Sequence, residues 1–159
     1  MHFRVGIGHD THRVGPGGPL RLGGLEIPWD RSLIGHSDAD VLLHAITDAI
    51  LGAAALGDIG ELFPDTDPAN KNRDSADMLA RAYGAAVMAG WRVVNVDCIV
   101  LAQKPKLSEY KAALRAKIAS ILGIPGDAVG MKAKTGEGVD AVGREEAIQA
   151  QCVVLLEKS

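Results

Sequence analysis

Residues 38–56 carry the strongest fold signal in the chain, because their apolar side chains recur at helical spacing. Apolar residues three and four positions apart share one side of an α-helix, so this segment is predicted to be a helix that buries one stripe. Ser37 is the predicted N-cap, and Asp38 and Asp40 suit the positive end of the helix dipole. The stripe consists of Val41, Leu42, Ala45, Ile46, Ala49 and Ile50.

Strand-like segments flank this helix. Residues 2–12 alternate, with Phe3, Val5 and Ile7 on one face, and this pattern predicts a strand. The Gly23-Gly24 pair predicts a short hairpin over 20–28. Further strands are expected over residues 91–103, 129–135 and 146–157.

Two more helices are expected, over 75–89 before Gly90 and from a Ser108 cap to about Leu122. The segments 57–68 and 136–145 are predicted to be loops. Strands separated by helical crossovers, with one hairpin at the end, predict an α+β fold, an α/β sandwich of one mixed sheet with helices on one face. The whole chain, residues 1–159, has the length of one domain. The other face of the sheet, rich in Val, Ile and Ala, needs cover that a homo-oligomer would supply.

Composition narrows the class of protein. Hydrophobic residues make up 47% of the chain and charged residues 23%, with a net charge of −3 and no basic stripe, so a nucleic-acid surface is not expected. No run reaches the roughly 18–20 apolar residues of a membrane span, and the first residues lack the plan of a signal peptide. We therefore expect a cytoplasmic protein. Cys98 and Cys152 lie in apolar runs and are predicted to be buried thiols.

The stretch "GHDTHRV" at 8–14 places a carboxylate and an imidazole two positions apart. In a strand Asp10 and His12 point to the same side, while His9 and Thr11 point to the other. His44 on the long helix would supply a third metal ligand, with Asp40 or Asp48 one turn away as support for its ring. Three mixed nitrogen and oxygen ligands are typical of a catalytic zinc with an open position. The spacing alone leaves open a chance D-x-H with a packed helix histidine.

Polar groups elsewhere suit an anionic ligand. Lys104, Lys106, Lys132 and Lys134 come at strand ends, beside backbone donors near Gly136, and such groups would suit phosphates. Solubilising lysines explain the same pattern equally well. The chain has no P-loop, no G-x-G-x-x-G after a strand and no G-x-S-x-G, which weakens nucleotide-triphosphate, dinucleotide and serine-hydrolase interpretations.

Taken together, "GHDTHR" at 8–13 and "HSDADVLLHAITDAILGAAALGDIGELFPDTDP" at 36–68 closely resemble the 2-C-methyl-D-erythritol 2,4-cyclodiphosphate synthase family. The resemblance includes "NVDCIVLAQKPK" at 95–106 and "VGMKAKTGEGVDAVGREE" at 129–146. It implies a homotrimer with active sites between subunits. It also implies a cyclising, CMP-releasing lyase of nonmevalonate isoprenoid biosynthesis, acting on 4-diphosphocytidyl-2-C-methyl-D-erythritol 2-phosphate.

The resemblance also implies roles for residues. Asp10, His12 and His44 would bind zinc, Glu137 would bind a Mg²⁺ or Mn²⁺ ion that bridges the substrate diphosphate, and His36 and Thr135 would be catalytic. The implied substrate contacts are Asp10, Thr11, His12, His36, Ser37, Asp58, Ile59, Gly60, Phe63, Pro64, Asp65, Thr66, Asp67, Ala102, Gln103, Lys104, Pro105, Lys106, Leu107, Ser108, Lys134, Thr135, Gly136, Glu137 and Arg144.

Three positions depart from the family pattern. Lys134 and Gly136 stand where the family has threonines, and Ala141 stands where a bulky apolar residue is common before the axial arginine, Arg144. The Ala141 departure bears on whether a cavity on the trimer axis takes an isoprenoid diphosphate. Two other functions are open. One is a zinc phosphohydrolase that uses the same three ligands to activate water, and the other is a non-catalytic trimeric module that binds anionic metabolites independently of metal.

Overall fold

A five-stranded mixed sheet forms the centre of the molecule, in the order β4-β1-β7-β5-β6. The structure is a computed structural model that describes residues 1–159. Only the β5–β6 pair is parallel, and the other neighbours are antiparallel. The strands are β1 (Phe3–Pro16), β4 (Arg31–Ile34), β5 (Trp91–Leu101), β6 (Val129–Lys134) and β7 (Ala147–Lys158). This mixed sheet confirms the predicted fold class.

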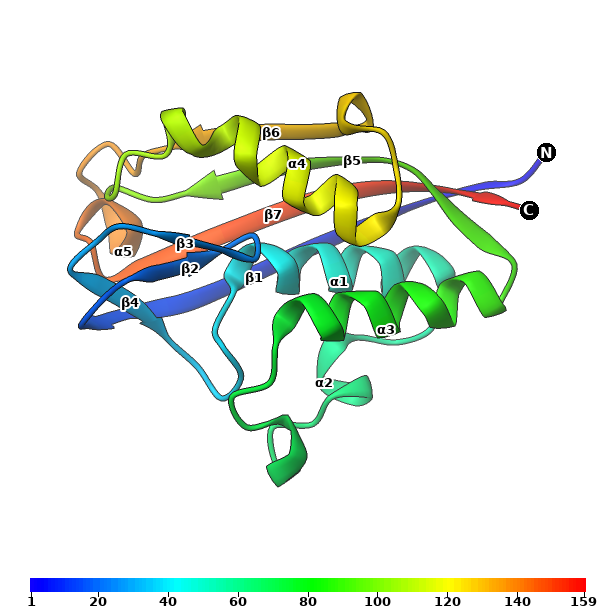
Figure 1. The fold of residues 1–159 in the computed structure, drawn as a ribbon, viewed down its shortest axis with the longest axis horizontal. Helices are drawn as coiled ribbons and strands as arrows, with labels where there is room; N and C mark the ends of the chain where they lie inside the picture. The colour runs from blue at the N-terminus through cyan, green and yellow to red at the C-terminus, as the bar shows by residue number, and fades with distance from the viewer.

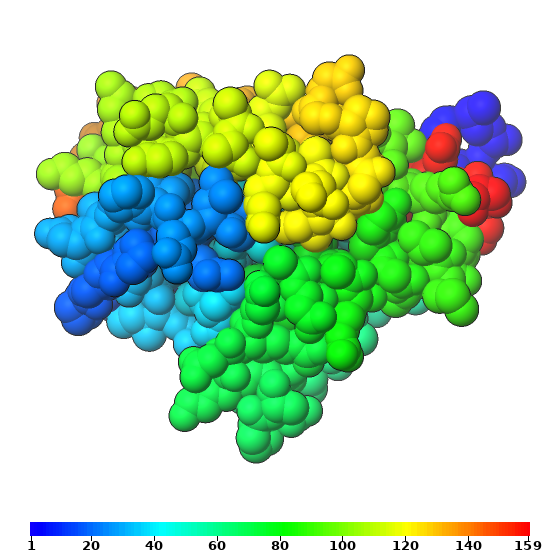
Figure 2. Space-filling view, viewed as in Figure 1, coloured from blue at the N-terminus to red at the C-terminus, as the bar shows by residue number.

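Three long helices lie on one face of the sheet (Figure 1). Helix α1 (Val41–Ala54) packs on β1 and β7, α4 (Lys111–Leu122) packs on β6, and α3 (Ser75–Met88) packs against α1. The predicted hairpin forms as β2 (Leu20–Leu22) and β3 (Leu25–Ile27), beside α1 and α4. On the side shown in Figure 2, the segment after α1 projects from the body of the molecule. No helix has the length and apolar character needed to cross a membrane.

Two glycines of β1 explain how closely α1 approaches the sheet. A β-carbon on Gly6 would collide with the carbonyl oxygen of Ala49, and one on Gly8 would collide with that of Ala45. The small residues of α1 and the missing side chains of β1 therefore let the two backbones touch. This contact places the first turns of α1 directly over the inward-facing residues that follow Gly8 in β1.

The predicted hairpin at the end of the chain is wrong. β7 lies between β1 and β5, so β6 and β7 are not neighbours. β7 has 12 residues and pairs along its length with both long strands, whereas β6 has six residues and stays at the edge. Central placement satisfies the backbone of the long apolar strand on both sides.

Several boundaries also differ from the predictions. Asp40, not Ser37, caps α1, because its carboxylate accepts hydrogen bonds from the backbone N–H of Leu43 and of the β2–β3 turn. Ser108 begins a 3₁₀ turn (Ser108–Tyr110) rather than capping α4, whose C-terminal glycine is as predicted. The expected loops contain the single-turn helices α2 (Ile59–Leu62) and α5 (Asp140–Gly143) and the 3₁₀ turn η1 (Pro68–Asn70), and β4 was not predicted.

The sheet face without helices carries exposed apolar side chains. Ile7 is 73% exposed and Val5 69%, and Phe3 and Val153 are about half exposed. The opposite face of the sheet is fully buried at Cys98 on β5 and Val154 on β7, and both cysteines are free and buried as predicted. Contiguous apolar exposure on a regular sheet face marks an interaction surface.

Candidate active site

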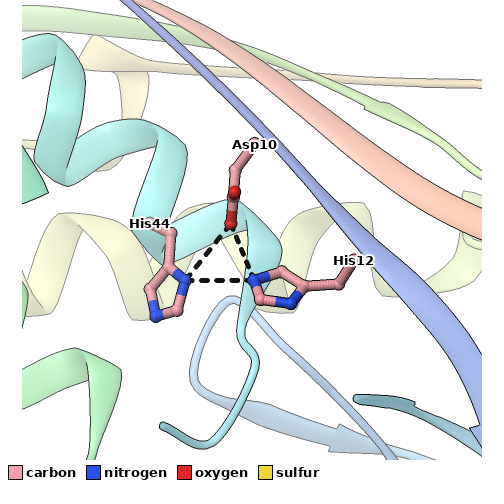
Figure 3. Close-up of side chains that lie close together, drawn as sticks. All are labelled: Asp10, His12 and His44. Carbon is pink, nitrogen blue, oxygen red and sulfur yellow. Dashed lines mark hydrogen bonds and ion pairs between the residues drawn. The ribbon is translucent and has the colours of Figure 1, made fainter. Parts of the chain in front are cut away.

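Three side chains meet with one ligand atom each directed at a common point (Figure 3). The Oδ2 atom of Asp10 lies 2.9 Å from Nε2 of His12 and 3.2 Å from Nδ1 of His44, and the two nitrogens are 3.3 Å apart. All three ligand atoms therefore lie within 4.8 Å of one another. This is the arrangement that a small cation with nitrogen and oxygen ligands requires.

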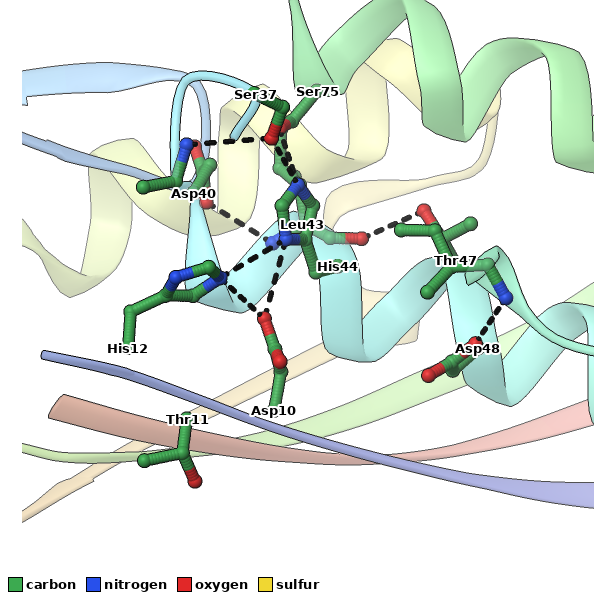
Figure 4. Close-up of polar contacts among 12 residues, drawn as sticks. Asp10, Thr11, His12, Ser37, Asp40, Leu43, His44, Thr47, Asp48 and Ser75 are labelled. Carbon is green, nitrogen blue, oxygen red and sulfur yellow. Dashed lines mark hydrogen bonds and ion pairs between the residues drawn. The ribbon is translucent and has the colours of Figure 1, made fainter. Parts of the chain in front are cut away.

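The strand and the helix each deliver their part of this group. Asp10 and His12 point inward from β1, whereas Thr11 points to the opposite side of the sheet, where its hydroxyl lies 3.2 Å from His9 (Figure 4). His44 comes from the first turn of α1, held against β1 by the close approach at Gly8. The predicted separation of His12 from His9 is thus present in the structure.

Hydrogen bonds on the far side of each ring fix the orientation of both histidines. Nδ1 of His12 donates to the carbonyl oxygen of Ile34 at 2.9 Å. Nε2 of His44 donates to the hydroxyl of Ser75 at 2.7 Å, and Ser75 donates to the Asp38 carboxylate. The other nitrogen of each ring therefore faces Asp10, so both rings are oriented as metal ligands before any ion binds.

Charge at the site favours a cation. Burial acts to raise the pKa of Asp10, but hydrogen bonds and charge from His12 and His44 outweigh burial and lower it to about 2. Burial acts to lower the pKa of His12, but the hydrogen bond and charge of Asp10, together with the Ile34 carbonyl and the charge of Asp40, outweigh burial and raise the pKa. Asp10 is therefore ionised at neutral pH, and an incoming cation competes with a proton at the His12 ring.

The predicted support of His44 by Asp40 or Asp48 is wrong. Asp40 is buried at the N-terminus of α1, where it accepts from three backbone N–H groups. Asp48 accepts from the backbone N–H of Ile59 at 2.7 Å. Both carboxylates are occupied by the main chain, and Ser75 with Asp38 supports His44 instead.

The three ligands lie in a cavity of about 380 Å³, called here the metal pocket. Its lining includes seven of the other expected contacts, and it adds Asn70 and Met78, which the sequence did not indicate. Asp58 and Asp67 are absent from the lining because their carboxylates cap α2 and η1, and Thr66 is absent as well. The metal pocket is lined by Asp10, His12, His36, Ser37, His44, Ile59, Gly60, Phe63, Pro64, Asp65, Asn70 and Met78.

A second cavity of about 450 Å³, called here the lysine pocket, shares no residue with the first. Gly136 and Glu137 lie outside its lining, although Gln103 accepts hydrogen bonds from Gly136 and Gly138. His36 and Thr135, the expected catalytic pair, thus line different pockets of one chain. The lysine pocket is lined by Ala102, Gln103, Lys104, Pro105, Lys106, Leu107, Ser108, Lys111, Ala133, Lys134 and Thr135.

Beyond Asp58, Thr66, Asp67 and Gly136, three more expected site residues lie outside both pockets. Glu137 is exposed and does not belong to the ligand group of the metal pocket. Thr11 lines a shallow hollow with Ala141 on the uncovered side, and Arg144 pairs there with Glu146 at 3.0 Å. Their assigned roles remain predictions.

An α+β sheet that holds an Asp-His-His ligand group with an open position, together with a lysine-lined cavity, defines a metal-dependent enzyme for anionic substrates. The sequence profile of the YgbB family matches residues 3–157. The chain belongs to the YgbB family.

Known relatives carry a more specific name. A protein of Rhodopirellula baltica called 2-C-methyl-D-erythritol 2,4-cyclodiphosphate synthase is 54% identical over 99% of this chain and 95% of its own length. A solved structure of a synthase of that name, in a form bound to CDP, is 39% identical and superposes with a TM-score of 0.90, covering 97% of this chain and 100% of the other. A bifunctional IspDF protein of Campylobacter jejuni is 42% identical with a TM-score of 0.96, and it matches 99% of this chain but only 43% of its own.

Proposed function

We propose that this chain converts 4-diphosphocytidyl-2-C-methyl-D-erythritol 2-phosphate into 2-C-methyl-D-erythritol 2,4-cyclodiphosphate and CMP. This is a step of nonmevalonate isoprenoid precursor biosynthesis. The observation that carries the proposal is the Asp10-His12-His44 group on the wall of a substrate-sized pocket, in a chain that matches synthases of this name over almost its full length. A cytoplasmic location stays a prediction from the sequence.

The reaction needs little proton transfer from the protein. An oxygen of the 2-phosphate attacks the β-phosphorus, a new P–O bond closes the ring, and the bond from the β-phosphorus to the oxygen of CMP breaks with its electron pair on CMP. The nucleophile is already anionic at neutral pH, so no strong general base is required. The barrier lies in bringing anions together in line, and a tethered nucleophile makes that step unimolecular.

The donor set fits zinc. Asp10, His12 and His44 would hold it, since two neutral imidazoles and one carboxylate leave a fourth tetrahedral position for a phosphate oxygen. Glu137, exposed near the lysine pocket, would hold a Mg²⁺ or Mn²⁺ ion at the substrate diphosphate. Bound at these places, the two ions supply charge neutralisation for the attacked phosphate and for the departing CMP.

The remaining side chains bind and orient the substrate. His36 and Ser37 stand beside the ligand group and would bind the phosphate and erythritol portion, with His36 aligning the reacting groups. The segment from Ile59 to Asp65 would enclose the methylerythritol and exclude water. The lysine pocket would hold cytidine and its phosphates, with Thr135 at its edge.

A homotrimer would join the two halves of this site. In one chain the metal pocket and the lysine pocket share no residue, and a second copy would set His36 of one chain opposite Thr135 of the other. The apolar face of β1 and β7, with Val5, Ile7 and Val153 exposed, is the surface that would bury against other copies. Arg144 would then lie near the axis, and the small side chain of Ala141 would leave any cavity there wider.

The test is the product of the reaction. Purified chain is incubated with the diphosphocytidyl substrate, zinc and magnesium, and products are followed by phosphorus NMR. The proposal predicts equal amounts of CMP and cyclic diphosphate, with no CMP after metal removal and recovery after zinc is restored. Linear phosphates would indicate a phosphohydrolase, and no turnover by folded, metal-loaded protein would refute an enzymatic role.

A further inference from the structure

We propose that Arg73 is a positioning residue that holds the outer wall of the metal pocket and thereby sets the affinity for the methylerythritol part of the substrate. The inference rests on the proposed function for its kinetic consequence. Its structural part, that one arginine fixes this wall, rests on contacts alone.

The wall belongs to the part of the chain that projects from the sheet. The segment with α2 and η1 leaves the end of α1 and returns at α3, and it forms the lobe at the bottom of Figures 1 and 2. Two of its side chains, Phe63 and Asn70, line both the metal pocket and an outer hollow of about 360 Å³. They therefore separate the two spaces. Arg73 lines only the outer hollow, so it contacts the wall from behind and does not face the metal ligands.

Arg73 makes three kinds of contact at once. Its Nη1 donates to Oδ1 of Asn70 at 2.9 Å, and its guanidinium carbon lies 4.8 Å from the centre of the Phe63 ring. Its Nε and Nη2 donate to Oδ2 of Asp77 at 3.2 and 3.0 Å. The Arg73 side chain is only 18% exposed. A planar guanidinium can hydrogen-bond to a carboxylate and an amide while it stacks on an aromatic ring, whereas a lysine ammonium cannot make all three contacts.

Asn70 connects Arg73 to the lining of the metal pocket. Its side-chain Nδ2 donates to the carbonyl oxygen of Pro64 at 2.8 Å, and the residue is 4% exposed. Because Arg73 can only donate, it fixes which end of the Asn70 amide faces Pro64. Loss of Arg73 would leave a buried amide oxygen without its partner and free the amide to turn.

Main-chain contacts tie the base of this segment. The backbone N–H of Asn72 donates to the carbonyl oxygen of His36 at 2.9 Å, and that of Asp38 to the carbonyl oxygen of Arg73 at 3.1 Å.

The Arg73 side chain adds a link to α3. Asp77 lies on α3, which packs on the same α1 that carries His44. Through Asp77, the Arg73 side chain connects Phe63 and Asn70 to the helices behind the metal ligands.

The experiment compares Arg73→Ala and Arg73→Lys with Arg81→Ala in the full chain. Arg81 is a matched control because it lies on α3 and pairs with the same Asp77, at 3.6 Å, but makes no hydrogen bond to the wall. Steady-state CMP release gives KM and kcat, CMP binding reports the lysine pocket, and hydrogen exchange reports residues 63–70. Zinc content shows whether the ligand group survives.

We expect both Arg73 variants to raise KM about ten-fold with kcat changed less than about three-fold, because a wall displaced by about 1 Å weakens substrate positioning while the ligands stay in place. Exchange should rise at residues 63–70 alone, and CMP binding and zinc content should stay as in the unmodified chain. Arg81→Ala should leave KM and exchange unchanged.

Three results would overturn the proposal. The proposal fails if Arg73→Ala has the same KM and the same hydrogen exchange as Arg81→Ala. It also fails if Arg73→Lys behaves like the unmodified chain, because a positive charge alone would then suffice. Joint loss of zinc, CMP binding and kcat would show a general structural role. If the unmodified chain releases no CMP, the proposed function fails, and local exchange at residues 63–70 still decides the role of Arg73.

Discussion

Nε2 of His44 donates a hydrogen bond to the Oγ of Ser75 at 2.7 Å, across 31 positions of sequence. The Ser75 hydroxyl in turn donates to Asp38, and Nδ1 on the other side of the His44 ring lies 3.2 Å from Oδ2 of Asp10. A metal site depends on such outer partners almost as much as on its ligands. Ser75 is fully buried, and both hydrogen bonds of its hydroxyl belong to this connection between His44 and Asp38.

Ser75→Ala should therefore lower zinc affinity about 10–100-fold while the fold persists. The reason is that His44 loses the acceptor that fixes its tautomer and ring angle. Competition with a chelating dye measures the affinity, and Ser120→Ala, on the exposed side of α4, is the control. Unchanged affinity in Ser75→Ala would show that His44 is oriented by other means.

Zinc binding should weaken as pH falls. The pKa of His12 is raised, with Asp10 as the main favourable partner, so a proton competes with zinc at this ring at a higher pH than at a free imidazole. The pKa of Asp10 is about 2, so Asp10 stays ionised and adds no pH dependence in the same range. The apparent affinity should drop towards ten-fold per pH unit below about pH 6.5. Titration calorimetry in two buffers measures the released proton, and a flat affinity from about pH 5.5 to 7.5 would contradict the assignment.

Ile7→Asp should break the assembly. Ile7 is 73% exposed on the uncovered sheet face, and a carboxylate there would be desolvated in an interface between copies. Light scattering should show three chains for the unmodified protein and one for the variant, with zinc retained and CMP release lost. Val87→Asp, on the outer side of α3, is the control. It places the same charge at an exposed apolar position away from the uncovered sheet face and should leave the assembly intact. An Ile7→Asp variant that remains trimeric would move the interface elsewhere.

Gly8→Ala should destabilise the fold by about 1–3 kcal/mol or more, because its β-carbon would meet the backbone carbonyl of Ala45. The shift of α1 should also separate His44 from Asp10. Gly84→Ala, in α3 with open space around it, is the matched control and should be neutral or stabilising by up to about 1 kcal/mol. Urea unfolding measures the free energy of unfolding of both variants. Equal changes in the two variants would show that β1 and α1 are not in tight contact.

The sequence predicted the parts of the site that local periodicity controls. Alternation in β1 separated Asp10 and His12 from His9 and Thr11, and helical spacing placed His44 on one ridge of α1 with Asp40 and Asp48. The position of β7 between β1 and β5 was not predictable, because strand order depends on pairing between distant segments.

The support of the ligands was also beyond the sequence. Asp40 and Asp48 have the right helical spacing to reach His44, but backbone N–H groups from the β2–β3 turn and from α2 bind them instead. Ser75 lies 31 positions from His44, the residue that it supports, and no local sequence pattern marks such a contact. Which side chain supports His44 depends on hydrogen bonds formed in the folded chain, and helical spacing does not reveal them.

The position of bound zinc tests the central claim most directly. Diffraction from zinc-soaked crystals, collected above and below the zinc absorption edge, locates the ion without reference to activity. The account predicts one anomalous peak per chain, about 2.0–2.2 Å from Oδ2 of Asp10, Nε2 of His12 and Nδ1 of His44. A peak held by other residues, or no peak at these three atoms in zinc-saturated crystals, would contradict it.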